Sequence, residues 1–158
     1  TQLGPASSTT QPNWWRSCDK NCTTAFARQC DGVNAPNEWS TVHTQFATKG
    51  FTIGKVLSSE MCRAVETAQG FDFGPPIELS QVLTYYVYDE GQRCTNTMAL
   101  LNTAPAAGTN TAMVSHAGFT CPPIDSLAWG EAAVYRPMPS GPPRFIARVP
   151  WNGWSLLP

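Results

Sequence analysis

Apolar side chains recur along the chain in two different patterns, which separate expected helices from expected strands. Trp39, Val42 and Phe46 follow a spacing of three to four residues, and Gly50 then stands where helices often end in a left-handed residue. Short apolar runs bounded by Gly, Pro or Ser favour strands. Helices are therefore expected over 37–49, 61–69 and 92–102. Strands are expected over 13–16, 54–58, 77–79 and 111–115, followed by a hairpin of 131–135 and 144–149, while 82–88 stays open between strand and loop.

The alternation of strands and helices predicts an α/β domain, a three-layer αβα sandwich with a mostly parallel central sheet. This domain is expected over 13–149, with an extended N-terminal tail over 1–12 and a C-terminal tail over 150–158. In such sheets, ligands bind beyond the carboxyl ends of the strands. The segments that follow the expected strands are therefore where functional residues are expected.

Charge and hydropathy exclude several classes of function. Charged residues make up 13% of the 158 residues and the net charge is -1, so the chain has no basic field to hold nucleic acid or acidic lipid. No apolar run approaches the ~18 residues that a membrane span needs. Motifs for haem attachment, a Gly-rich phosphate loop and a four-ligand zinc site are absent from the sequence, so neither a cofactor nor a metal is expected.

Six cysteines in a small chain of low charge predict disulfides that staple the fold. Up to three bridges, with the pairing open, are expected among Cys18, Cys22, Cys30, Cys62, Cys94 and Cys121. Buried free thiols in a cytosolic protein are the alternative interpretation. The disulfide interpretation favours a secreted or periplasmic location, and a chain beginning at Thr1 is expected to have lost a signal peptide. Asn21 lies in a formal glycosylation sequon, whose use depends on the source of the protein.

Three of the expected strands end in residues with distinctive chemistry. The first ends in WWRSC over 14–18, the second continues as LSSEMCRAVETA over 57–68, and the third continues as MVSHAG over 113–118. These motifs resemble the histidine phosphatase, or phosphoglycerate-mutase-like, superfamily, and its small periplasmic or secreted members look closest. The segment LSSEMCRAVETA is similar to that family's element of Ser-Ser-Pro, two residues, Arg, three residues and Thr-Ala. The similarity covers roughly 13–149.

The resemblance implies a site for a phosphate-like anion, made of Arg16, Arg63 and His116. Where the family has an Arg-His pair whose histidine is the nucleophile, this sequence has Arg16-Ser17. A serine hydroxyl is a weak nucleophile unless a base lies beside it. If catalysis remains, its residues are therefore expected to be Ser17 and, as the base, His116.

The family's general acid is a carboxylate from the region after the third strand. The resemblance places Asp89 or Glu90 in this role, and the sequence does not choose between them. Solvated loop charges are the ordinary alternative for both residues.

The basic residues also have ordinary structural interpretations. Arg16 would stack on a neighbouring tryptophan or pair with Asp19. Arg63 would pair along its helix with Glu60 or Glu66. His116 would be a hydrogen-bonded loop residue. Because Arg16, Arg63 and His116 all follow the ends of expected strands, a shared anion site is favoured over a separate structural role for each.

Two functions from different classes follow. The first is a secreted histidine-phosphatase-like domain that has lost catalysis and serves binding or structure. It holds a phosphate-like anion, or uses its extended termini to associate with other copies or with a cell-surface partner. The alternative is an active extracytoplasmic phosphomonoesterase with a non-standard nucleophile. We favour the first, because loss of a nucleophile removes several orders of magnitude of rate.

Overall fold

The computed structural model describes residues 36–84, 87, 89–116, 121, 127–128 and 130–157. The expected tail over 1–12 and the expected strand over 13–16 lie outside the described residues. So do several residues singled out above, namely Arg16, Ser17, Cys18, Asp19, Asn21, Cys22 and Cys30. The described part is an α/β fold, with a three-stranded sheet, a two-stranded sheet and helices.

Three α-helices form within two residues of the expected positions. They are α1 (Pro36–Lys49), α2 (Cys62–Phe71) and α3 (Glu90–Leu101). Gly50 follows α1 with a φ of 69°, the left-handed end expected there. The expected end of the second helix at residue 69 is wrong, because α2 continues to Phe71 and Asp72 is left-handed with a φ of 46°. Its backbone N–H donates to the carbonyl of Gln69, and Asp tolerates this conformation better than most residues.

The central sheet has the strand order β2-β1-β3, and both of its pairings are parallel. Its strands are β1 (Ile53–Ser58), β2 (Ile77–Leu79) and β3 (Asn110–Val114), each at an expected position. Ser58 lies opposite Leu79 on one side and Val114 on the other. All three strands therefore reach their carboxyl ends at the same edge of the sheet.

Gly54 allows β1 to approach the segment before β3. A Cβ at this position would lie 2.5 Å from the Thr109 hydroxyl oxygen. The pairing with β3 shifts register between Ile53 and Lys55, as expected where a glycine permits a bulge. The sheet is regular from Lys55 onwards, so the irregularity lies at the end of the strand far from the edge described above.

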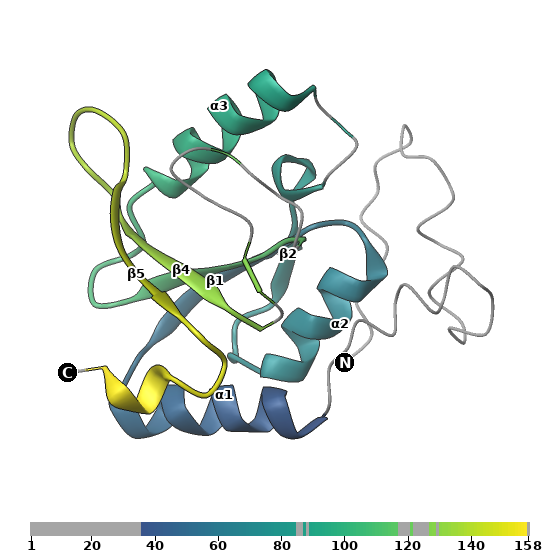
Figure 1. Ribbon diagram of the computed structural model, residues 1–158, viewed down its shortest axis with the longest axis vertical. Coiled ribbons are helices and arrows are strands. Elements are labelled where there is room, and N and C mark those ends of the chain that lie inside the picture. The colour runs from purple at the N-terminus through teal and green to yellow at the C-terminus, as the bar shows by residue number, and fades with distance from the viewer. Residues whose placement is uncertain are drawn as a thin grey trace.

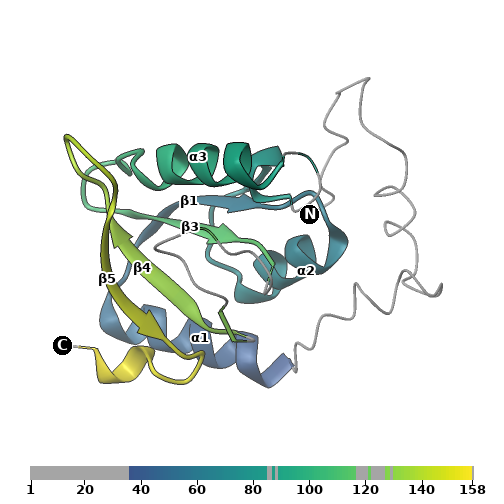
Figure 2. The same ribbon diagram turned by 45° about the horizontal axis from the view of Figure 1, so that its top comes forward.

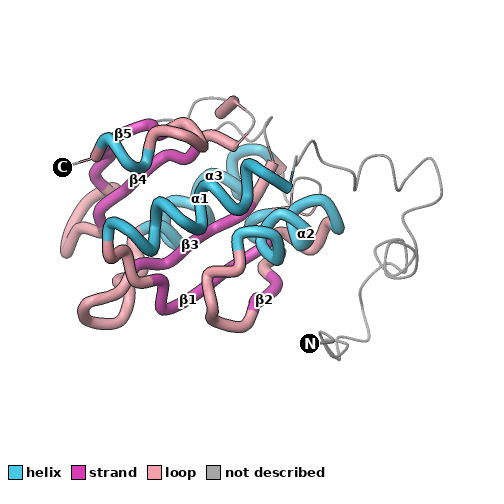
Figure 3. The backbone as a smooth tube through the Cα atoms, turned by 90° about the horizontal axis from the view of Figure 1, so that it is seen from below, coloured by secondary structure: helices cyan, strands magenta, loops and turns pink. Residues whose placement is uncertain are grey.

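The expected hairpin also forms, as β4 (Ala132–Arg136) paired antiparallel with β5 (Arg144–Val149). Figure 1 shows these elements, and Figure 2 shows that α3 covers one face of the parallel sheet while α1 and α2 lie on the other. The hairpin lies beyond the β3 side of the sheet (Figure 3). The described chain is thus layered as helix, sheet and helix.

The segment 82–88, left open above, begins in a short helical turn. This turn, η3 (Gln81–Leu83), follows directly after β2 and buries Leu83. Tyr85, Tyr86 and Tyr88 lie outside the described residues.

An aromatic cluster fixes the C-terminal segment on α1. Trp154, in the turn η4 (Trp154–Leu156), packs on Phe46 of α1 with ring centroids 4.5 Å apart. Ser155 donates its backbone N–H to the side chain of Gln45, and Lys49 donates to the carbonyl of Leu157. The segment after β5 is therefore anchored to the domain, and Trp154 is engaged within it.

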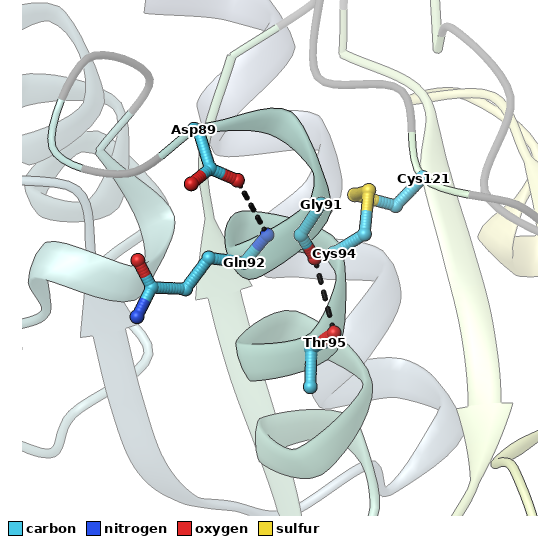
Figure 4. Close-up of a disulfide and its surroundings, with 6 residues drawn as sticks. All are labelled: Asp89, Gly91, Gln92, Cys94, Thr95 and Cys121. Atoms are coloured by element: carbon cyan, nitrogen blue, oxygen red, sulfur yellow. Dashed lines mark hydrogen bonds between the residues drawn. A yellow bond between two sulfur atoms is a disulfide. The ribbon is translucent and has the colours of Figure 1, made fainter.

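One disulfide joins Cys94 of α3 to Cys121, whose side chain is fully buried (Figure 4). The expectation of disulfides is thus confirmed for this pair, whereas Cys62 lies in α2 with its side chain outside the described part. The bridge links the helix on one face of the sheet to the segment that follows β3. It therefore closes a loop that contains the whole of β3.

Replacing both Cys94 and Cys121 by alanine is expected to lower the free energy of unfolding by about 3 kcal/mol. The two residues are 27 apart in sequence, and releasing a loop of this length restores conformational entropy to the unfolded chain. Urea unfolding followed by far-UV circular dichroism measures the change. Thr95→Ala, an exposed change on the same helix, serves as the control. Equal unfolding midpoints for the double variant and the control would contradict the prediction.

Candidate functional site

The parallel register brings three segments together at the carboxyl edge of the sheet. Ser59 follows β1, Thr84 follows β2 through η3, and His116 follows β3. Backbone bonds continue the sheet past the strand ends, since Ser59 N–H donates to Val114 and Ser80 N–H donates to Ser58. These residues are distant in sequence but adjacent in space because the three strands end at one level.

Arg63, in the first turn of α2, reaches the same place. Its Nε–H donates to Nδ1 of His116 over 3.1 Å, so the structure brings together two of the three residues expected to bind an anion. Both side chains are partly buried. The turn Ser59-Glu60-Met61 connects β1 to α2 and sets the position of Arg63 relative to the sheet.

The hydrogen bonds around His116 form a chain with one consistent direction. A guanidinium is always a donor, so Nδ1 of His116 accepts and the neutral ring carries its proton on Nε2. That Nε2–H donates to the hydroxyl oxygen of Ser59 over 2.7 Å. Ser59 Oγ also accepts from the Met61 backbone and lies 3.2 Å from Thr84 Oγ1. The Thr84 oxygen accepts in turn from the backbone N–H of Glu60.

Sequence reasoning did not identify Ser59 and Thr84 as site residues. Ser58 and Ser59 lie shortly before α2, where hydroxyls commonly cap a helix, yet the N-cap position is Met61, which makes no side-chain capping bond. Ser59 and Thr84 are instead fully buried, and their hydroxyls support His116. The available sequence evidence was that Ser59 directly follows β1 and that Thr84 follows the short turn after β2.

Burial and a neighbouring cation keep His116 neutral. Desolvation of the ring, and to a lesser degree the charge of Arg63, lower the pKa of His116 from 6.5 to about 4. At neutral pH the described part of the site therefore contains one positive charge, on Arg63, next to an uncharged imidazole.

Arg63 has no carboxylate partner in the described part of the chain. The ion pairs found there are Lys55–Glu78 and Arg148–Glu131. The pairing of Arg63 with Glu60 or Glu66, considered above, is therefore not formed. Arg63 instead uses Nε on His116 and Nη2 on the sulfur of Met61, at 3.4 Å.

The two candidate acids lie at the start of α3. Asp89 is the N-cap of this helix, accepting the backbone N–H of Gln92 over 2.9 Å (Figure 4). Glu90 occupies the first turn and both residues are exposed. Among the described contacts, none joins either carboxylate to Arg63 or His116. Asp89 thus has a structural role in the start of the helix.

The described residues contain neither a candidate metal site nor a helix suited to span a membrane. Histidine, cysteine and acidic residues do not gather there in a group of three or more that could hold a metal ion. The described helices include none that is both long and apolar enough to cross a membrane.

Acidification is expected to destabilise the fold through His116. Its pKa is about 4 in the folded chain and near 6.5 when unfolded. As the pH falls from 6.5 to 4, His116 therefore binds a proton in the unfolded chain before it does so in the folded chain. This difference lowers the free energy of unfolding by up to about 3 kcal/mol. Urea unfolding at intervals across this range measures the loss for the native chain.

Two histidine variants isolate this contribution from the titration of carboxylates. His116→Gln should lose less stability over the same pH range, since it lacks the ring that is protonated on unfolding. His43→Gln, a change of the exposed histidine on α1, serves as the matched control. A His116→Gln variant with the same pH dependence as the native chain would refute this assignment.

Comparison of the chain with protein-family models, curated proteins and solved structures finds no match in any of the three. The geometry of the site is therefore the basis for inferring what the protein does.

Proposed function

We propose that this chain is a secreted or periplasmic binding domain of histidine-phosphatase-like type, which holds a phosphate-like oxyanion without transferring it. The observation that carries the proposal is the contact between Arg63 and His116 at the carboxyl edge of the parallel sheet.

An anion would supply what Arg63 lacks. A partly buried guanidinium loses hydration and is normally compensated by an opposite charge. Within the described residues, Arg63 has only a neutral imidazole and a thioether as partners, and the thioether is a weak acceptor. A planar guanidinium matches the oxygens of phosphate or sulfate, so an oxyanion is the ligand that suits it best.

The start of α2 adds to the attraction for an anion. Its N-terminus has no side-chain cap and no acidic residue in the first turn. Backbone N–H groups at such an end, together with the helix dipole, favour negative charge. Arg63 belongs to this turn, so both contributions act in the same region.

The hydrogen bonding of His116 supports binding over catalysis. A catalytic serine needs an adjacent base with a free lone pair. Among the described residues, the hydroxyl that contacts His116 is that of Ser59, which is fully buried, and the ring presents a proton to it from Nε2. The substitution of serine for the family's nucleophilic histidine, expected at Ser17, supports the same conclusion.

The disulfide and the resemblance to histidine phosphatases support the rest of the proposal. A bridge between Cys94 and Cys121 is typical of an oxidising compartment, which favours a secreted or periplasmic location. Arg63 and His116 come from the two family-like motifs within the described residues, and they lie in contact. Both observations are what a degenerate member of that superfamily would have.

Isothermal titration with inorganic phosphate at pH 6 tests the binding function. The native chain should bind phosphate, and Arg63→Gln should weaken binding at least about tenfold, since charge-assisted hydrogen bonds contribute roughly 1.5–3 kcal/mol. Arg144→Gln, which removes an exposed arginine on β5, should leave affinity unchanged. Equal affinity in the two variants would refute the role of Arg63.

Hydrolysis of an aryl phosphate tests the absence of catalysis. We expect the native chain to show no turnover above the buffer rate between about pH 4 and 8, a range that includes the titration of histidine. Turnover that disappears in His116→Ala would support the phosphomonoesterase alternative and refute the proposal of a purely binding domain.

A further inference from the structure

We infer that the site takes up one proton together with its oxyanion, that this proton binds at Nδ1 of His116, and that Ser59 is a positioning residue for this exchange. The inference rests on the proposed function and adds to it the charge state and class of the ligand. It follows from the different partners of the two ring nitrogens of His116.

In the structure, the Nδ1 lone pair of His116 accepts the Nε–H of Arg63. This hydrogen bond occupies a donor that an oxyanion would otherwise use. Protonation of Nδ1 removes the acceptor, because an imidazolium has N–H groups on both nitrogens. The Arg63 Nε–H is then released, and the new Nδ1–H becomes a second donor at the same place.

The exchange is balanced in charge. One proton from solvent forms the N–H bond at Nδ1, and the hydrogen bond from Arg63 to that nitrogen is lost. Among the described residues of the site, the positive charge rises from one to two, and a dianion neutralises both. A tetrahedral dianion such as sulfate, or the dianionic group of a phosphate or sulfate monoester, therefore suits the loaded site better than a carboxylate with its single charge.

Ser59 holds the other nitrogen throughout. Its oxygen accepts the Nε2–H over 2.7 Å, and the neutral and protonated rings both carry that hydrogen. The hydroxyl is itself fixed by the Met61 backbone N–H and by contact with Thr84, and its side chain is fully buried. The ring can therefore change its protonation at Nδ1 without turning.

The forces that keep His116 neutral are those that a dianion opposes. Burial of the ring and the charge of Arg63 hold the pKa of His116 near 4. Among the described side chains, Arg63 is bonded to the ring of His116 and is charged. Thr84 contacts Ser59, which holds the other side of the ring, and is neutral. A bound dianion attracts the guanidinium and stabilises the imidazolium, so it raises the pKa of His116. Linkage then requires that anion affinity increase as the pH falls.

Titration with sulfate measures the proton directly. Sulfate stays a dianion over the pH range used, so a proton gained on binding belongs to the protein. Calorimetry at pH 6 in buffers of different ionisation enthalpy should give an uptake of roughly 0.5–1 proton per sulfate, and affinity should rise up to about tenfold per pH unit on acidification. His116→Gln should bind sulfate with no proton uptake, whereas His43→Gln should behave as the native chain.

The role of Ser59 has its own readout. In Ser59→Ala the imidazolium loses an acceptor for Nε2–H, which disfavours the charged ring. The midpoint of the pH dependence of sulfate affinity should therefore move to lower pH by about one unit, as expected for a lost hydrogen bond to a charged group. An unchanged midpoint would refute the positioning role of Ser59.

The outcomes separate this inference from the function on which it rests. Sulfate binding that depends on Arg63 but has no pH dependence and no proton uptake would overturn the inference and leave the proposed anion site intact. Failure of both sulfate and phosphate to bind the native chain would overturn both. Proton uptake that persists in His116→Gln would assign the proton to another group and would also overturn the inference.

Discussion

The parallel register of β1 with its two neighbours is the constraint on which the site depends. Ser58 faces Leu79 and Val114, so the residues that follow the three strands emerge at one level. A shift of a single residue would reverse which side chains face each layer and would separate Ser59 from His116. Each local feature of the site, including the first turn of α2, is positioned by this pairing.

Much of the architecture is predictable from the sequence because local forces determine it. The helical spacing of Trp39, Val42 and Phe46 marks α1, and short apolar runs mark the strands. The end of α2 was missed, because Asp72 adopts the left-handed conformation usually expected of glycine. The general rule for ligand sites in parallel sheets also anticipated that Arg63 and His116 would meet.

What the sequence does not predict comes from contacts between distant segments. Ser59 bonds to His116, which lies 57 positions later in the sequence. Ser59 also contacts Thr84, which lies 25 positions later. Spacing likewise leaves the pairing of Cys94 with Cys121 undetermined, since any two of six cysteines satisfy it. The position of Asp89 in the sequence made it a candidate general acid. In the structure its carboxylate accepts the backbone N–H of Gln92 and caps α3.

The loop closed by the disulfide contains β3 and His116, while Ser59 and Arg63 lie outside it. Detachment of β3 from β1 therefore cannot carry His116 far from α3, to which its segment is covalently joined. We therefore expect the two parts of the site to open in different local units. In the oxidised chain, hydrogen exchange near His116 should follow motions of α3, whereas exchange near Arg63 should follow the packing of α2 against the sheet.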